Sequence, residues 1–177
     1  NPENVGGVFR NAAAFGVDGV LLDPRSCDPL YRKAIRVSMG ETLCLPFARA
    51  SAWPEALGSF REAGYTIVGL HPARLEPGGV ELRRLDVAWN LGRRVLLVLG
   101  NEGEGLSRET RRAVDRCVRI DMAPGVDSLN VASASAVAPV GLHPMPRLYA
   151  SQWNGRNPCC RTHRPSSCNV SHAGLRE

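Results

Sequence analysis

Three glycines and two glutamates lie within six residues directly after an apolar run, a combination that indicates a ligand site. The run and the loop span residues 96–107 and read LLVLGNEGEGLS. An apolar run bounded by glycine is typical of a buried strand, and ligands of open α/β sheets bind at the carboxyl ends of strands. Glycines let the backbone approach a ligand closely. We therefore expect a binding loop that begins at Gly100.

The acidic residues of this loop restrict which ligand it would bind. It is not a phosphate-binding P-loop, because no Gly-Lys-Ser/Thr follows, and its glycine spacing differs from that of the dinucleotide fingerprint. Glu102 and Glu104 would repel phosphate, so a cationic or uncharged ligand fits better. A tight structural turn is the alternative. Elsewhere no nucleophile elbow or Ser-His-Asp arrangement is evident.

Two further polar, glycine-containing stretches, residues 1–11 and 124–130, lie at the ends of apolar segments. Together the three stretches resemble the motifs of the SpoU (TrmH-type) RNA 2′-O-ribose methyltransferases, in the SPOUT superfamily. The first motif is matched by NVGG, RN and FG within residues 4–16, and the second by LGNEGEGLS in residues 99–107. IDM in residues 120–122 and SLNVA in residues 128–132 match the third. All three occur in order within residues 1–138.

This resemblance implies an α/β fold with a mostly parallel sheet, helices on its faces and a deep C-terminal trefoil knot. It also implies a homodimer that binds S-adenosylmethionine within the knot and methylates ribose 2′-hydroxyl groups of tRNA or rRNA. The motif positions predicted to contact the cofactor are Gly100, Ile120 and Leu129. Those predicted to form the catalytic site are Asn4, Arg10, Glu102, Ser128 and Asn130.

The resemblance gives Arg10 the task of helping to deprotonate or orient the ribose 2′-hydroxyl. Arginine stays protonated in proteins, so we expect Arg10 to stabilise the developing alkoxide or to act with an RNA phosphate, not to serve as a free base. Asn4, Glu102, Ser128 and Asn130 would hold the loops and the reacting groups. An acidic loop also suits a cationic sulfonium cofactor, and the reaction requires no metal.

Periodicity and capping signals predict the elements that must position these motifs. Asn1 and Pro2 favour a helix over residues 1–16, in which Gly6 and Gly7 would each cost about 1 kcal/mol relative to alanine. Something is therefore expected to pack closely against them. Further helices are expected over residues 31–37, 51–63 and 107–115 and from Asn130 onward, with strands over residues 18–23, 44–47, 65–70, 96–99 and 117–122. The alternation predicts a parallel α/β sheet.

The two ends of the chain depart from the family pattern. Family members normally carry a strand ahead of the first motif, and many carry an RNA-binding extension before it, so we expect the chain to be a fragment. The helix after Asn130 normally runs on and packs in the dimer. Proline inside a helix costs about 3 kcal/mol, so Pro139 is expected to end the helix near Ala138.

Residues 139–177 differ in composition from the methyltransferase-like domain over residues 1–138. This tail holds five arginines and one glutamate, whereas residues 1–138 carry 17 basic and 16 acidic residues. It is rich in Pro, Cys and His without apolar periodicity, which is typical of disorder or of a non-native reading frame. A zinc site there is disfavoured, because adjacent cysteines and irregular gaps do not match the usual spacing.

The remaining features place the chain among cytoplasmic proteins. No apolar run is long enough to span a membrane, no signal peptide is evident, and the cysteines at 27, 44 and 117 lie in or beside apolar runs, as reduced thiols do. The leading hypothesis is an S-adenosylmethionine-dependent RNA 2′-O-methyltransferase. The alternatives are an inactive RNA- or cofactor-binding remnant of such an enzyme and, less favoured by the glycine spacing, a nucleotide-binding oxidoreductase.

Overall fold

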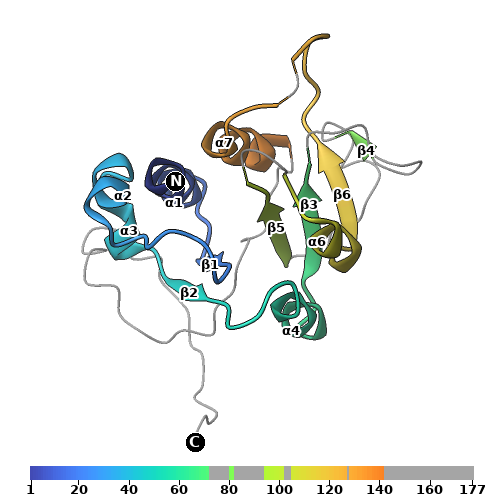
Figure 1. Ribbon diagram of the computed structural model, residues 1–177, viewed down its shortest axis with the longest axis horizontal. Coiled ribbons are helices and arrows are strands. Elements are labelled where there is room, and N and C mark those ends of the chain that lie inside the picture. The colour runs from blue at the N-terminus through green and yellow to red at the C-terminus, as the bar shows by residue number, and fades with distance from the viewer. Residues whose placement is uncertain (72–79, 82–93, 102–104, 127, 142–177) are drawn as a thin grey trace, which may run out of the picture.

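The computed structural model describes residues 1–71, 80–81, 94–101, 105–126 and 128–141. Helices and strands alternate along most of this part of the chain (Figure 1). The helices are α1 (Pro2–Ala14), α2 (Arg32–Val37), α3 (Glu41–Cys44), α4 (Ala56–Glu62), α6 (Arg108–Ala113) and α7 (Val131–Gly141). The strands are β1 (Val20–Leu22), β2 (Phe47–Arg49), β3 (Thr66–Leu70), β4 (Val80–Glu81), β5 (Val95–Leu99) and β6 (Arg116–Arg119).

The described strands form two sheets in which every pairing is parallel. β1 pairs with β2, and the larger sheet has the order β4-β6-β3-β5. The prediction of an α/β fold with parallel strands flanked by helices is therefore confirmed. The strands fall into two sheets, however, where one mostly parallel sheet was expected. The knot stays a prediction.

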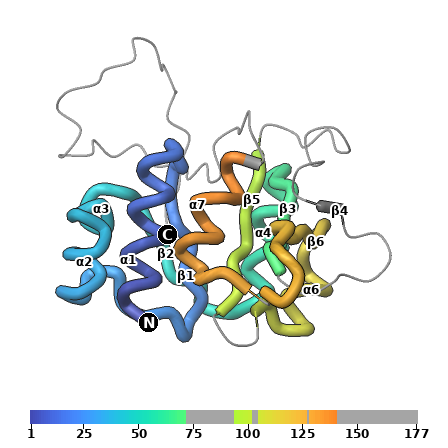
Figure 2. The backbone as a smooth tube through the Cα atoms, turned by 90° about the horizontal axis from the view of Figure 1, so that it is seen from above, coloured from blue at the N-terminus to red at the C-terminus, as the bar shows by residue number. Residues whose placement is uncertain are grey.

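Strands β3 and β5 are buried on both faces, and successive side chains enter two different apolar clusters. Val95 and Leu97 belong to a cluster that Ala138 of α7 joins, whereas Leu96 and Val98 pack with Leu57 of α4. This alternation follows from the two-residue period of a strand. Figure 2 shows α7 between α1 and the larger sheet, while α4 and α6 lie farther from α1. The two apolar clusters therefore fix these parallel strands, so that the carboxyl ends of β3, β5 and β6 lie at the same edge of the larger sheet.

Helix α1 packs closely against two other helices through its glycines. A Cβ atom on Gly6 would lie 2.6 Å from the carbonyl oxygen of Ala34 in α2, and one on Gly7 would lie 2.6 Å from Cβ of Ala132 in α7. Both distances are too short for any side chain. The expectation that something packs against these glycines is confirmed, because their missing side chains let α1 approach both neighbours.

Two expectations about secondary structure were wrong. Helix α7 does not end near Ala138 but continues through Pro139 to Gly141. Pro139 is itself buried, beside the fully buried Ala138. Burial of apolar surface therefore offsets part of the cost of a proline inside a helix.

The second error concerns the strand expected over residues 44–47. Residues 41–44 form helix α3, whose preceding residue Gly40 has a positive φ of 89°, and β2 begins only at Phe47. Pro46 precedes the strand, and its carbonyl oxygen accepts a hydrogen bond from the Val20 N–H at 2.9 Å. The apolar pattern of so short a segment does not distinguish helix from strand.

Candidate cofactor and catalytic site

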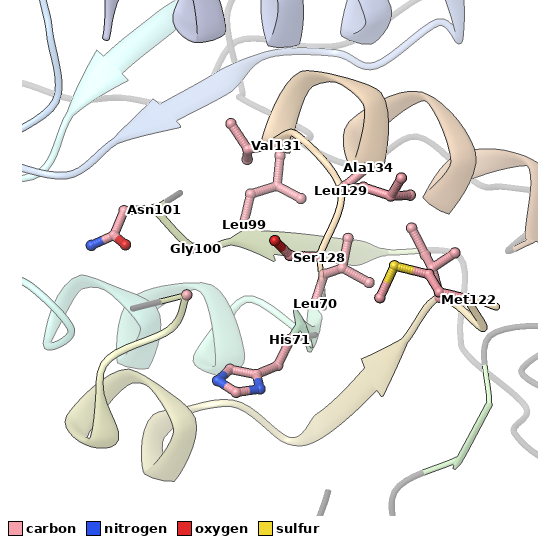
Figure 3. Close-up of a pocket in the computed structure, with 12 residues that line it drawn as sticks. Leu70, His71, Leu99, Gly100, Asn101, Met122, Ser128, Leu129, Val131 and Ala134 are labelled. Carbon is pink, nitrogen blue, oxygen red and sulfur yellow. The ribbon is translucent and has the colours of Figure 1, made fainter. Parts of the chain in front are cut away.

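A cavity lies at the carboxyl ends of β3, β5 and β6 (Figure 3). All three strands are parallel, so the residues that follow them meet at one edge of the sheet. Helix α7 covers the cavity with Val131 and Ala134. The lining residues are Leu70, His71, Leu99, Gly100, Asn101, Gly105, Ile120, Met122, Ser128, Leu129, Val131 and Ala134. The second and third sequence motifs therefore share one cavity.

The loop after β5 has a backbone geometry that requires glycine at position 100. A Cβ atom there would lie 2.2 Å from the carbonyl carbon of Gly105 and 2.5 Å from its oxygen. The loop closes on itself at this point, because the Asn101 N–H donates to the Gly105 carbonyl oxygen at 3.0 Å. After the loop, Ser107 caps α6 by accepting a hydrogen bond from the Thr110 N–H at 3.2 Å. Gly100 therefore presents bare backbone to the cavity.

The predicted cofactor contacts come together in this cavity. Gly100, Ile120 and Leu129 all line it, and so does Ser128, which was assigned to the catalytic set. Leu129 keeps 40% of its surface exposed. Its side chain is therefore still able to bury apolar area when a ligand enters.

Asn4 and Asn130 are joined directly, although 126 residues separate them in sequence. The Asn130 side-chain Nδ2 donates to Oδ1 of Asn4 at 2.9 Å. The Oδ1 atom of Asn130 caps α7 by accepting from the Ala132 N–H at 2.8 Å. One side chain thus fixes the start of α7 and ties it to α1. Asn11 strengthens the same connection, because its Nδ2 donates to the Ala132 carbonyl oxygen at 2.6 Å.

Of the predicted catalytic set, Ser128 lines this cavity, whereas Arg10, Asn4 and Asn130 do not. Arg10 is exposed on α1 and, within the described part of the chain, makes no hydrogen bond or ion pair. Glu102 lies outside the described residues.

The most notable lining residue that the sequence reasoning missed is His71. It directly follows the carboxyl end of β3, so the rule that identified the loop after β5 would also have indicated it. Its side chain is 7% exposed, and burial, helped by the positive charge of Arg111 on α6, lowers the pKa of its imidazole below the usual value. The imidazole is therefore uncharged at neutral pH.

A second cavity lies between β1 and β5 and adjoins the first at Gly100. All three residues of β1 and four successive residues of β5, Leu96 to Leu99, line it. Successive side chains of a strand point to opposite faces, so a cavity lined by consecutive residues lies in the plane of the strands. Asn4 lines this second cavity, with apolar residues of α1.

The described residues hold neither a metal cluster nor a membrane-spanning helix. Within residues 1–71, 80–81, 94–101, 105–126 and 128–141, no group of three His, Cys, Asp or Glu side chains is placed to hold a metal ion. The cysteine- and histidine-rich tail lies outside these residues. In the same part of the chain no helix has the length and apolar character needed to cross a membrane.

Comparison with known proteins gives one consistent result. Residues 1–139 match the model of the SpoU rRNA methylase family. An uncharacterized tRNA/rRNA methyltransferase of Mycobacterium tuberculosis is 43% identical over 136 residues, which are 77% of this chain and 46% of that protein. The chain therefore spans about half the length of this relative.

Solved structures agree. The AdoMet-bound rRNA methyltransferase from Sinorhizobium meliloti superposes with a TM-score of 0.69 at 30% identity, covering 81% of this chain and 52% of that one. An RNA 2′-O-ribose methyltransferase superposes with a TM-score of 0.64 at 28% identity, covering 80% and 51%.

Proposed function

Because the chain belongs to the SpoU rRNA methylase family, we propose that it transfers a methyl group from S-adenosylmethionine to a ribose 2′-hydroxyl of tRNA or rRNA. The observation that carries this proposal is the single cavity lined by Gly100, Ile120, Ser128 and Leu129, which come from two separate motifs. A similar solved structure contains AdoMet, and another is titled an RNA 2′-O-ribose methyltransferase.

The cavity suits S-adenosylmethionine on physical grounds. One side is apolar, with Leu70, Met122 and Leu129, and can bury the adenine ring, whereas Asn101 and Ser128 offer polar groups. A Cβ atom at Gly100 would clash with the loop, so the backbone there is bare and open to close approach. No described lining side chain carries a permanent positive charge that would repel a sulfonium.

The bound cofactor supplies a methyl group on a positively charged sulfur, and the residues of this chain would prepare the acceptor. A ribose hydroxyl is a weak nucleophile that must lose or share its proton as it attacks. We assign to the exposed Arg10 the stabilisation of the developing alkoxide, directly or with an RNA phosphate. Asn4, Asn130, Ser128 and Glu102 would hold the loops and the acceptor in position for in-line attack.

The proposal includes the domain, its assembly and its location. Residues 1–138 form the methyltransferase domain, residues 139–177 are a separate tail, and the enzyme acts as a homodimer in the cytoplasm. Support for the dimer comes from α7, on which Val137 and Val140 are 42% and 65% exposed. Apolar side chains exposed on one helix favour a protein interface.

The proposal is tested by incubating the 177-residue chain with radiolabelled S-adenosylmethionine and separate tRNA and rRNA pools. We expect label in one RNA pool, in a nucleotide that resists alkaline hydrolysis at its 3′ side because its 2′-hydroxyl is methylated. Cofactor binding without incorporation would instead identify an inactive remnant. Label on a base would contradict ribose specificity while leaving methyl transfer intact.

A further inference from the structure

His71 occupies a position in the cavity that the three motifs do not account for. It follows Leu70, the last residue of β3, and its backbone N–H donates to the Val118 carbonyl oxygen of β6 at 2.9 Å. The imidazole is thus held at the carboxyl edge of the sheet, where it lines the same cavity as Gly100 and Ile120. Only 7% of its surface is exposed.

The side chains around His71 divide the cavity into two regions. Figure 3 shows the imidazole directed toward the side on which Asn101 lies and away from Met122. Among the described lining residues, His71 is the one with an ionisable side chain. S-adenosylmethionine has a corresponding division, because its adenine ring is largely apolar at its faces and its ribose and amino-acid parts are polar.

We propose that His71 is a further cofactor-binding residue, whose imidazole forms a hydrogen bond with a polar group of S-adenosylmethionine in this cavity. This inference rests on the proposed function. A neutral imidazole carries one donor nitrogen and one acceptor nitrogen, and a nitrogen of either kind suits a polar group of the cofactor.

The charge of the imidazole matters as much as its hydrogen bond. Burial and the guanidinium of Arg111 both lower the pKa of His71, which keeps the ring neutral at pH 7. A neutral ring does not repel the positive sulfonium, whereas a cation enclosed in the same cavity would. A permanent charge at position 71 should therefore discriminate against the sulfonium cofactor in particular.

The test compares two ligands that differ in charge. Dissociation constants of S-adenosylmethionine and of the uncharged thioether S-adenosylhomocysteine are measured by calorimetry at pH 7.5 with the 177-residue chain and three variants. His71→Ala should raise the dissociation constants of both ligands by about tenfold through the lost hydrogen bond. His71→Gln, which keeps a donor and an acceptor, should stay within about threefold of the parent. His71→Lys should raise the dissociation constant of S-adenosylmethionine about tenfold more than that of S-adenosylhomocysteine.

The ratio of the two constants separates a binding role from a structural one. Loss of folded protein lowers the apparent affinity for both ligands equally, so it leaves the ratio unchanged. Thr42→Val, which alters a buried hydroxyl of α3 outside the cavity, serves as the matched control and should preserve the ratio and both affinities.

Two results would overturn the inference while leaving the proposed function in place. In both cases the parent chain binds both ligands. In the first, His71→Ala binds S-adenosylmethionine and S-adenosylhomocysteine as tightly as the parent does. In the second, His71→Lys has the same ratio of the two dissociation constants as the parent. A parent chain that binds neither ligand would instead refute the proposed function, and the inference with it.

Discussion

The side-chain amide of Asn130 donates to the side-chain oxygen of Asn4 at 2.9 Å and so joins the beginnings of α7 and α1. The same Asn130 caps α7 through its other amide atom, which accepts from the Ala132 N–H. One residue therefore sets both the start of a helix and its attachment to a segment 126 positions away. Since Ser128 and Leu129 precede it directly, this connection also positions two residues of the cavity.

Substitution of Asn130 should separate its two tasks. Asn130→Ala removes the cap and the link and should lower the free energy of unfolding by about 1–2 kcal/mol. Asn130→Asp keeps an acceptor for the cap but loses the donor to Asn4, so it should cost less. Chemical denaturation measures both, and a double-mutant cycle with Asn4→Ala should show coupling. Additive effects of the two substitutions would contradict the link.

Alanine at position 100 should disrupt the loop after β5. The added Cβ atom would meet the Gly105 backbone at 2.2 Å, so the loop must move. We expect Gly100→Ala to weaken S-adenosylmethionine binding by at least about tenfold, because displaced backbone cannot present the same groups. Calorimetry checks this, with Gly58→Ala in α4 as the control, since a Cβ atom there meets nothing within 4 Å. Parent-like affinity would show that the loop does not contact the cofactor.

Removal of the Arg10 side chain should affect methyl transfer without affecting folding. Arg10 is exposed and makes no hydrogen bond or ion pair among the described residues, so Arg10→Ala should leave the melting temperature unchanged. If its guanidinium stabilises the alkoxide, kcat should fall about 10²- to 10³-fold. Arg36→Ala on α2 removes an equal charge and is the control. Equal methyl incorporation by the Arg10 variant and the parent would exclude Arg10 from the mechanism.

Acid should destabilise the protein through His71. Its pKa in the folded chain lies below the ordinary value of 6.5, because of burial and then of Arg111, so the unfolded chain binds a proton more readily. The free energy of unfolding should therefore be highest above pH 6.5 and fall as the pH drops from there toward the folded pKa. Denaturation between pH 7.5 and 5.5 measures this slope, and His71→Gln should reduce it. An identical slope in the variant would assign the effect to other groups.

A charge on the outer face of α7 should prevent self-association. Val140 is 65% exposed, and burial of aspartate in an apolar interface carries a large desolvation cost. We expect the parent chain to be a dimer by light scattering and Val140→Asp to be a monomer with an unchanged melting profile at low concentration. Exposed Met39 between α2 and α3 provides the control substitution, Met39→Asp. A monomeric parent would refute the dimer proposal for this chain.

Local signals predicted most elements and missed those decided by packing. The Asn1 cap, the Pro2 start and the apolar run before Gly100 act within a few residues, and α1 and β5 formed where these signals placed them. The expectation at Pro139 was wrong, because burial of the proline offsets part of the cost of its place in a helix. That burial depends on tertiary packing and not on the local sequence.

The motifs, their order and hence the family follow from the sequence alone, since residue identities at fixed spacing carry that information. It also indicated that Gly6 and Gly7 must be close to other chain segments, because glycine inside a helix needs such a reason. The three-dimensional packing shows which segments those are, that Asn130 reaches Asn4, and that His71 lines the cavity with Gly100 and Ile120. Contacts between residues tens of positions apart follow from strand order and helix packing, which no local pattern specifies.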